Sequence, residues 1–295
     1  MSNLDFLFLG EPRSLDAAAR ASLPGSFAAL PEGVVHYELA GPDDGQAVVL
    51  IHGFSTPYFI WDATFAALVS AGFLVLRYDL FGRGYSDRPD TAYTMDLFLR
   101  QLLGLLDAFG IRQPVDLVGL SMGGAIAVAF TARHPQRVRR MCLLDPAGLP
   151  LKMPPLARLI RAPLLGELIF GVFGGRFLLA NQAGDFFRAP ADFAAFQARY
   201  ALQMPYRGFR RALLSTVRGD AISDRAAEFA AVGRQPRPKL LIMGENDRTV
   251  PFETHVRIQD LMPGIEFHAI PLAGHLPHYE WPEVVNPLLV QFLTA

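Results

Sequence analysis

The segment that decides the fold is GLSMG, residues 119–123, which separates two apolar stretches of the 295-residue chain. The stretch before it, 115–120, is predicted to be a buried strand, and the stretch after it, 122–133, an apolar helix. A G-x-S-x-G pattern in this context is typical of a sharp turn, in which a Cβ atom at either glycine would clash and the serine oxygen is lifted clear of the sheet. The N-terminus of the helix favours a developing negative charge at that point. These features indicate that Ser121 is a nucleophile.

A serine hydroxyl needs a base, and an acid that orients the base, because it is a weak nucleophile at neutral pH. Among the seven histidines, His275 is distinguished by its place after the predicted strand 266–270, at the carboxyl edge of the sheet where ligands gather. His278 is the alternative, although a position in a loop or at a helix start suits it better. We therefore predict that His275 is the base.

The predicted acid is Asp247, since it follows another strand, 239–243, at the same edge. It lies between the nucleophile and the base in the chain, which is the order that a G-x-S-x-G nucleophile uses. Asp145 remains the alternative acid because it also follows a predicted strand. A third carboxylate, Asp79, is predicted to tie down the loop 81–86 instead.

Attack on a carbonyl group creates an oxyanion, which requires preorganised hydrogen-bond donors. Two backbone N–H groups are predicted to supply them: that of Met122, directly after the nucleophile, and that of Phe54, in the glycine turn after strand 47–51. His52 lies in the same turn, and we interpret it as a residue that braces this loop. The sequence contains no glycine-rich phosphate loop, metal-ligand cluster or dinucleotide fingerprint, so no cofactor and no metal are expected.

Strands and helices alternate on both sides of the serine turn. Strands are predicted at 47–51, 73–79, 115–120, 138–144, 239–243 and 266–270, and helices at 61–71, 95–109, 122–133 and 253–262, with a last helix after Pro282. This alternation predicts an α/β fold with a mainly parallel sheet that is covered by helices on both faces. The alternating stretch 34–39 is predicted to form a hairpin that leads into strand 47–51, because turn residues fill 41–45.

The alternation stops at Pro146. Residues 149–220 are predicted to be helical segments interrupted by prolines and glycines, without a strand-like run. We therefore expect one core, made of residues 1–148 and 221–295, with a helical insertion at 149–220. Within the core, residues 1–33 are predicted to be an arm or short helix that lies on the domain.

Composition excludes several classes of protein. Hydrophobic residues make up 51% of the chain, and the 27 basic and 28 acidic residues leave a net charge of −1 without a run of like charge, so we expect no nucleic-acid partner. The single cysteine, Cys142, cannot form an internal disulfide and is predicted to be buried in a strand. The sequence shows neither a signal peptide nor a transmembrane segment, so a cytoplasmic protein is expected. The oligomeric state is left open.

Five motifs together resemble one superfamily. They are HGF at 52–54, the loop 79–86, GLSMGG at 119–124, GEND at 244–247 and the dipeptide Gly274-His275. From Val34 to the C-terminus the sequence is similar to the α/β-hydrolase superfamily, in the branch of small bacterial-type esterases, monoacylglycerol lipases and C–C bond hydrolases. The resemblance implies a triad of Ser121, Asp247 and His275, and an oxyanion hole formed by the predicted N–H groups. It also implies that the insertion is a helical cap over the active site.

Departures from the family patterns narrow the expected chemistry. Haloalkane dehalogenases and epoxide hydrolases have Asp where this chain has Ser121, so both chemistries are disfavoured. Meta-cleavage C–C hydrolases tend to have a polar residue before the serine and Trp after the histidine, whereas this chain has Leu120 and Leu276. These differences disfavour, without excluding, C–C bond hydrolysis.

The insertion is rich in aromatic side chains. They and one methionine are Phe170, Phe173, Phe177, Phe186, Phe187, Phe193, Phe196, Met204 and Phe209. Most are expected to pack the insertion onto the sheet, and the others to line the cleft with few polar groups, which favours a mainly apolar substrate. We therefore expect a serine carboxylic-ester hydrolase that acts through an acyl-enzyme on a small-molecule ester. The alternatives are a serine C–C bond hydrolase and a non-catalytic ligand-binding protein on the same fold.

Overall fold

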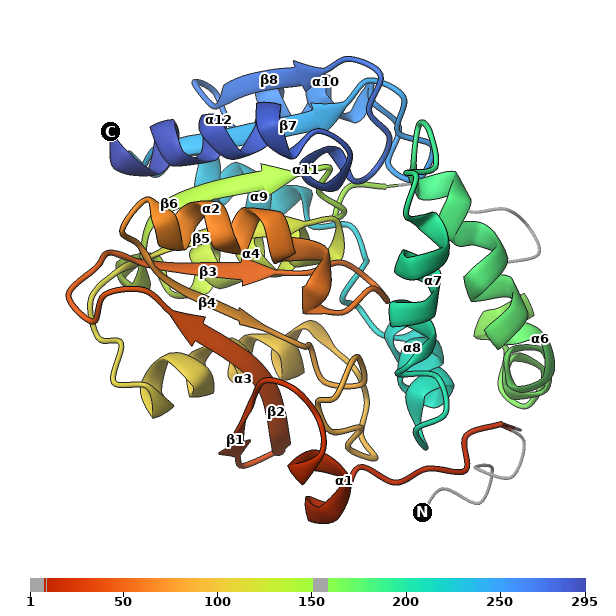
Figure 1. Ribbon diagram of the computed structural model, residues 1–295. Helices are drawn as coiled ribbons and strands as arrows, with labels where there is room; N and C mark the ends of the chain where they lie inside the picture. Colours follow the sequence, from red (N-terminus) through yellow and green to blue (C-terminus); the bar gives the residue numbers. More distant parts are fainter. Residues whose placement is uncertain (1–7, 9, 151–158) are drawn as a thin grey trace.

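An eight-stranded sheet in the order β1-β2-β4-β3-β5-β6-β7-β8 forms the centre of the computed structural model (Figure 1), which describes residues 8, 10–150 and 159–295. The strands are β1 (Ser26–Leu30), β2 (Gly33–Ala40), β3 (Ala47–Ile51), β4 (Leu74–Tyr78), β5 (Val115–Leu120), β6 (Val138–Leu144), β7 (Lys239–Gly244) and β8 (Glu266–Ile270). Strands β3 to β8 are parallel, whereas β1 and β2 are antiparallel to their neighbours. The predicted α/β fold with a mainly parallel sheet is confirmed.

Helices cover both faces of the sheet. One face carries α3 (Met95–Ala108), α4 (Met122–Arg133), α9 (Ala226–Gly233) and α10 (Thr254–Leu261), and the other carries α2 (Asp62–Ser70), α11 (Pro277–Glu280) and α12 (Pro282–Thr294). Successive residues of a central strand enter the two different cores, as Leu117 and Val118 of β5 do. Cys142 of β6 is buried, as predicted. Burial on both faces explains why these strands are continuously apolar in sequence.

The predicted hairpin between 34–39 and 47–51 is wrong. β2 pairs with β1 on one side and with β4 on the other, so β4 lies between β2 and β3. The physical reason is burial: β3 is almost entirely buried and takes a place inside the sheet, between β4 and β5, whereas the alternating β2 suits a place near the edge. The reading of 1–33 as an arm is also corrected, since β1 is the edge strand of the sheet.

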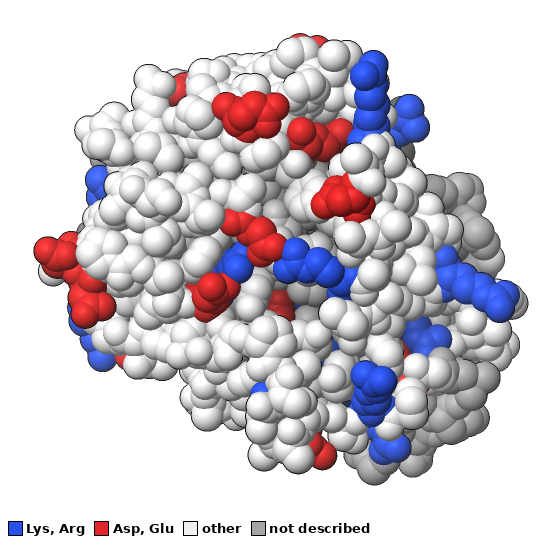
Figure 2. All heavy atoms as spheres, in the orientation of Figure 1, with Lys and Arg blue, Asp and Glu red and all other residues white. Residues whose placement is uncertain are grey.

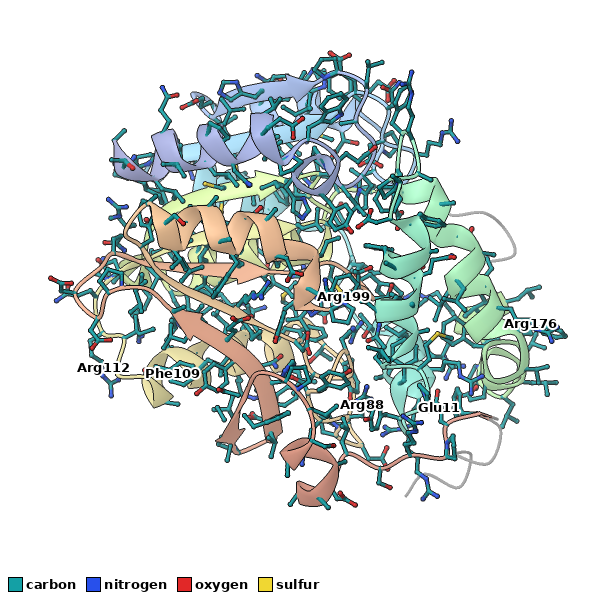
Figure 3. The ribbon with its side chains drawn as sticks, viewed as in Figure 1. Glu11, Arg88, Phe109, Arg112, Arg176 and Arg199 are labelled. Carbon is teal, nitrogen blue, oxygen red and sulfur yellow. The ribbon has the colours of Figure 1, made fainter. Side chains whose placement is uncertain are left out.

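Residues 10–16, which precede α1 (Ala17–Ala21), lie against the inserted helices. The Arg13 N–H donates to the Pro205 carbonyl (3.0 Å), and the Arg207 N–H donates to the Arg13 carbonyl (2.8 Å). Glu11 is buried beside α8 (Phe209–Arg218), where its carboxylate accepts hydrogen bonds from Arg210 (2.8 Å) and from the Gly208 N–H (Figure 3). These contacts tie the start of the described chain to the insertion.

Inserted helices lie beyond the carboxyl ends of the parallel strands (Figure 1). Between β6 and α9 they are α6 (Leu165–Asn181), the 3-10 turn η4 (Gln182–Asp185), α7 (Phe193–Ala201) and α8. The part of the predicted insertion at 151–158 lies outside the described residues. Most of the nine side chains pack the insertion, as expected: Phe170, Phe186, Phe196 and Phe209 are buried, and Phe193 and Met204 pack partly buried against the same core. The insertion therefore covers the carboxyl edge of the sheet, where the predicted catalytic residues follow the strands.

On the face seen in Figure 2, acidic and basic side chains are interspersed, and neither sign of charge forms a continuous patch. Within the described ranges, no helix combines the length and apolar character needed to cross a membrane. On the outer side of α6, Arg176 points away from the sheet (Figure 3).

Candidate active site

Ser121 stands at the junction of β5 and α4 in a backbone conformation that is uncommon for a residue with a side chain, with φ 53° and ψ −118°. The flanking glycines make this turn possible. A Cβ atom on Gly119 would lie 2.4 Å from the Gly123 carbonyl oxygen, and one on Gly123 would lie 2.1 Å from the Ile51 carbonyl oxygen. The turn is held in place because the Ser121 N–H donates to the Leu144 carbonyl (2.9 Å). The local geometry therefore agrees with the steric argument from the sequence.

His275 and Asp247 come together at the carboxyl ends of β8 and β7. The His275 Nδ1 atom lies 2.7 Å from Asp247 Oδ2, and both residues are buried. The other carboxylate oxygen of Asp247 accepts hydrogen bonds from the backbone N–H groups of Thr249 (2.7 Å) and Val250 (2.9 Å). This arrangement fixes the carboxylate and leaves the Nε2 side of the imidazole for other partners.

The electrostatics of this pair favour charge separation. Burial alone would lower the pKa of His275, but the adjacent Asp247 carboxylate and their hydrogen bond outweigh it, so the pKa is raised. Burial likewise opposes ionisation of Asp247, yet the imidazole and two backbone donors hold the pKa of this carboxyl below its usual value. Asp247 is therefore an anion that stabilises a protonated His275.

Asp145, the alternative acid, lies next to the same pair but has a different environment. It is fully buried at a positive φ of 40°, and its Oδ1 accepts from the Gly244 N–H (3.0 Å), while Oδ2 accepts from no donor among the described residues. Burial and the facing Asp247 carboxylate raise the pKa of Asp145 well above its usual value. The environment of Asp145 thus favours the neutral carboxyl form more strongly than that of Asp247 does, and the histidine bonds to Asp247.

The glycine turn after β3 lies directly against the nucleophile, since a Cβ atom on Gly53 would be 3.3 Å from Ser121 Cβ. His52 braces this turn as predicted: its Nδ1 lies 2.9 Å from the Gly53 carbonyl, and its Nε2 accepts from the Leu80 N–H (2.9 Å). Burial lowers the pKa of His52 to about 4, so the ring is neutral. Among the described residues, the Phe54 N–H donates no hydrogen bond to the chain.

The backbone N–H of Met122, the first residue of α4, resembles that of Phe54. Among the residues with described positions, Met122 donates no backbone hydrogen bond to the chain, whereas the N–H of Gly124 bonds to the Ser121 carbonyl (2.9 Å). An N–H at a helix start that lacks an intrahelical acceptor is suited to bind an oxygen with negative charge. Both N–H groups predicted for the oxyanion hole are therefore free to bind an oxyanion.

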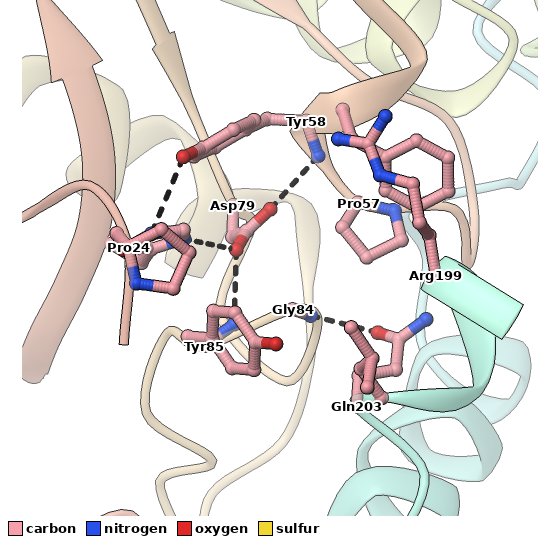
Figure 4. Close-up of a pocket in the computed structure, with 11 residues that line it drawn as sticks. Pro24, Pro57, Tyr58, Asp79, Gly84, Tyr85, Arg199 and Gln203 are labelled. Atoms are coloured by element: carbon pink, nitrogen blue, oxygen red, sulfur yellow. Dashed lines mark hydrogen bonds and ion pairs between the residues drawn. The ribbon is translucent and has the colours of Figure 1, made fainter. Parts of the chain in front are cut away.

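Asp79 holds together the loops around the glycine turn after β3, which agrees with its predicted role of holding the loop 81–86. Its Oδ2 accepts from His36 (2.6 Å) and from the Tyr85 N–H (2.9 Å), and its Oδ1 accepts from the Tyr58 N–H (2.8 Å), as Figure 4 shows. Gln203, on the chain between α7 and α8, adds a link by accepting from the Gly84 N–H (2.7 Å). The small pocket in Figure 4 is lined by these bonded polar groups and by apolar side chains such as Phe59 and Leu202, which indicates a structural role for the polar groups.

Arg83 is a residue whose role at the site the sequence did not reveal. It is fully buried, donates to the Phe54 carbonyl (2.7 Å) and the Phe81 carbonyl (3.0 Å), and reaches Thr216 of α8 (2.9 Å). Burial lowers its pKa to about 10, so the guanidinium remains charged. Arg83 joins the predicted oxyanion turn to the insertion, a contact between segments 133 positions apart that no local pattern encodes.

Asp185 and Glu280 are two further residues that sequence reasoning missed. The His275 N–H donates to the Asp185 carbonyl (2.7 Å), so the insertion holds the histidine loop. Glu280 accepts from the Gly274 N–H (2.6 Å) and from the Phe187 N–H (2.8 Å). No local pattern in the sequence reveals these residues, because the bonds join the insertion, α11 and the loop after β8 to one another.

A cavity of about 450 Å³ lies between the sheet edge and the insertion. Its lining residues are Gly53, Phe54, Ser55, Thr56, Leu120, Ser121, Phe177, Leu178, Asn181, Gln182, Gly184, Asp185, Arg248, Thr249, His275 and Leu276. Ser121 and His275 thus share one cavity, although no hydrogen bond joins their side chains in the described chain. Most of the surface that lines the cavity is apolar, as expected, and η4 and the loop after β7 add amide, carboxylate and guanidinium groups to it. Of the aromatic residues in the insertion, Phe177 lines this cavity.

Three of these groups have metal-ligand chemistry. Oxygen and nitrogen atoms of Asp145, Asp247 and His275 lie within 4.8 Å of one another. However, Asp247 and His275 already bind each other at 2.7 Å, and burial together with the facing Asp247 carboxylate raises the pKa of Asp145. The arrangement therefore suits a proton-handling network.

Comparison with known proteins places the chain in a family. Residues 48–288 match the profile of the Alpha/beta hydrolase family. A 2-hydroxymuconate semialdehyde hydrolase from Pseudomonas putida is 30% identical over 74% of this chain and 76% of its own. The crystal structure of an enol-lactonase from Burkholderia xenovorans is 25% identical, covers 92% of this chain and 100% of its own, and has a TM-score of 0.78. A thermophilic esterase from Thermogutta terrifontis is 26% identical over 92% of this chain and 97% of its own, with a TM-score of 0.76.

The family match spans most of the chain and includes every residue of the predicted triad. Its fold agrees with the eight-stranded, mostly parallel sheet between two layers of helices. The chain is therefore a hydrolase, and it belongs to the alpha/beta hydrolase family.

Proposed function

We propose that the chain is a serine hydrolase of carboxylic esters, including lactones, with Ser121 as nucleophile, His275 as base and Asp247 as the orienting acid. The observation that carries this proposal is the buried contact of 2.7 Å between His275 Nδ1 and Asp247 Oδ2, at a cavity that Ser121 also lines. The similarity to an enol-lactonase and an esterase supports the same chemistry.

The reaction follows from the geometry of these groups. His275 Nε2 takes the Ser121 proton while Oγ forms a bond to the ester carbonyl carbon, and the carbonyl oxygen becomes an oxyanion held by the N–H groups of Phe54 and Met122. The C–O bond to the alkoxide then breaks, and His275 returns the proton to this leaving group. A water molecule next gives a proton to His275 and attacks the acyl-serine, which releases the carboxylic acid and restores Ser121.

The insertion acts as a cap in this proposal. Helix α6 and turn η4 contribute Phe177, Leu178 and Gln182 to the cavity wall opposite the serine. The apolar side chains suit an acyl chain or a ring, and the polar ones suit oxygen atoms of the substrate. We place the cap at 149–220, between the two parts of the core.

A fluorophosphonate probe tests the nucleophile directly. We expect it to label Ser121, and we expect Ser121→Ala to abolish labelling and to lower ester hydrolysis by at least ~10³-fold, because no other group replaces the lost oxygen. Labelling that persists in Ser121→Ala would assign the nucleophile elsewhere. An unlabelled wild-type protein without esterase activity would favour a ligand-binding protein on this fold.

Carbon–carbon bond hydrolysis is the second candidate, because the similarity to a 2-hydroxymuconate semialdehyde hydrolase favours it. Such a reaction must first help a dienol ketonise, which calls for polar groups near the serine. Leu120 and Leu276 line the cavity beside Ser121 and His275 and supply none.

Both substrate types should be compared on one preparation. We expect short to medium acyl esters to react with kcat/KM of at least ~10⁴ M⁻¹s⁻¹. Ring-fission dienoates are expected to react at least ~100-fold less efficiently. Dienoate cleavage as fast as that of the best ester would replace the ester assignment and leave the triad in place.

A further inference from the structure

Arg83 is a buried cation to which the described chain gives no carboxylate partner. Its side chain is completely buried, and no Asp or Glu of the described ranges forms an ion pair with it. The groups that it reaches are neutral, namely two backbone carbonyls and one hydroxyl. Arg210, another buried arginine, differs because it forms an ion pair with Glu11 (2.8 Å).

A buried charge without an opposite charge is energetically unfavourable. Hydrogen bonds to carbonyl and hydroxyl oxygens satisfy the donors of Arg83, but they do not neutralise its positive charge. A hydrophobic side chain of similar volume would fill the same space without this cost. The positive charge becomes favourable when a negative charge forms close to it, as happens at an oxyanion during acyl transfer.

Two contacts of Arg83 are with Phe54, whose N–H is predicted to bind the oxyanion. The Nε atom of Arg83 donates to the Phe54 carbonyl (2.7 Å), and the guanidinium carbon lies 5.4 Å from the centre of the Phe54 ring. The positive charge also acts on the glycine turn itself, since it is one of the causes that lower the pKa of His52. Arg83 therefore holds Phe54 and exerts its field where the oxyanion is expected.

The peptide unit that contains the Phe54 N–H is held by a second bond. His52 Nε2 accepts from the Leu80 N–H, so Nδ1 carries the proton of the neutral ring and donates to the Gly53 carbonyl (2.9 Å). In a trans peptide the carbonyl of one residue and the N–H of the next point in opposite directions, so this bond directs the Phe54 N–H. His52 and Arg83 thus hold the two peptide units on either side of the Phe54 Cα atom.

We propose that Arg83 is a positioning residue of the oxyanion hole, which holds Phe54 in place and whose positive charge favours the oxyanion at the Phe54 N–H. This inference rests on the proposed function, in which Ser121 attacks an ester carbonyl. Attack by Ser121 and attack by water on the acyl-serine both create an oxyanion, so Arg83 acts in both steps. Arg83 is not among the residues that line the cavity, so binding of the uncharged ester should not depend on it.

Steady-state kinetics with ethyl butyrate tests this role. Loss of one oxyanion donor lowers kcat by about 10²- to 10³-fold, and Arg83 acts through such a donor, so Arg83→Met should lower kcat by at least ~30-fold and leave KM within about threefold. Arg83→Lys keeps the charge and should lose only about fivefold. Arg88→Met is the matched control, because Arg88 donates to the carbonyls of Gly84 and Ser86 in the same loop, and its kcat should stay within about threefold.

A boronic acid provides a readout that does not depend on turnover. The boron atom of butylboronic acid accepts the Ser121 oxygen while the serine proton moves to His275, and the product is a tetrahedral anion that resembles the intermediate of ester hydrolysis. Calorimetry should give a Kd that is at least ~30-fold higher in Arg83→Met and within about threefold of the wild type in Arg88→Met. The Kd of ethyl butyrate, measured in Ser121→Ala, should change by less than about threefold when Arg83→Met is added.

Wild-type kcat and wild-type affinity for the boronic acid in Arg83→Met would overturn this role. Equal losses in Arg83→Met and Arg88→Met would also overturn it, because they would reflect general damage to the loop. If Arg83→Met does not fold, Arg83→Lys decides: kcat and affinity for the boronic acid should fall together by about fivefold, and wild-type values of both would overturn the role. A wild type that hydrolyses no ester, yet binds the boronic acid in a manner that depends on Arg83, would refute the proposed reaction alone.

Discussion

The two walls of the cavity that Ser121 and His275 line are built in different ways. On the sheet side, the polar groups of Asp247 and His275 bind each other or the backbone, and Ser121 is held in a strained turn by flanking glycines. On the insertion side, Gln182 has no partner within the described chain, and Phe177 is 56% exposed. Backbone hydrogen bonds and the glycine turn keep the side chains of the sheet wall in place, whereas the insertion wall presents an exposed aromatic side chain. In the proposed function, the sheet wall carries the reaction and the insertion wall contacts the substrate.

The largest expected effect separates two carboxyl groups on the sheet side. Asp247→Asn should lower kcat/KM by about 10³- to 10⁴-fold, because the amide no longer stabilises a protonated His275 and favours the wrong tautomer. Asp145→Asn should cost less than about 10-fold, since the raised pKa of Asp145 favours its neutral form and an amide can still accept from the Gly244 N–H. Steady-state kinetics of both variants with one ester measures the difference. The reverse order would make Asp145 the acid.

A smaller effect is expected from the insertion side. Phe177→Ala should lower kcat/KM for a p-nitrophenyl octanoate by about 10-fold and leave that for the acetate within about twofold, because the lost ring contacts the acyl chain and not the reacting atoms. Phe173→Ala is the control, since Phe173 is exposed on the same helix and does not line the cavity. Equal losses for both esters in Phe177→Ala would contradict the division between the two walls.

The pH dependence of the rate should change when Asp247 beside His275 is replaced, and should not change when a residue of the insertion wall is replaced. His275 must be neutral to act as a base, so the rate should rise with pH. The raised pKa of His275 places the midpoint of this rise above 6.5. Asp247→Asn removes the charge that raises the pKa, and the midpoint of its residual activity should move to lower pH. Asp145→Asn and Gln182→Leu should leave the midpoint in place, and a shift in Asp145→Asn to lower pH would show that Asp145 is ionised.

The smallest expected effect concerns stability. Because the pKa of Asp145 is raised by folding, the folded state keeps a proton that the unfolded state releases above its ordinary value of 3.8. The stability that this group contributes is therefore complete at low pH and declines as pH rises, by at most about 1.4 kcal/mol per pH unit. Asp145→Asn should remove this decline, so that urea unfolding at pH 5 and pH 8 shows the variant gaining stability relative to the wild type. No difference between the two pH values would mean that folding leaves the pKa of Asp145 unshifted.

Much of the fold could be predicted because its signals are local. The strands β5 and β6 and the helix α4 have the predicted bounds, since a buried parallel strand is a continuous apolar run and glycines mark the turns between elements. Strand β1 and the pairing of β2 could not be predicted. A strand that is half exposed has a weak pattern, and its partner in the sheet is chosen by contacts between distant segments.

The candidate site also has features that local sequence predicts and features that depend on contacts between distant segments. The sequence alone determined that Ser121 sits between a strand and a helix, and that Asp247 and His275 follow strands whose carboxyl ends share one edge, because these facts depend on residue order and local turn chemistry. Only the tertiary structure decided that His275 bonds to Asp247 and not to Asp145, that burial raises the pKa of Asp145, and that the Gln182 amide is buried without a partner among the described residues. Each of these depends on which groups meet in space and how far water is excluded from them, and neither quantity is encoded in the periodicity of a segment.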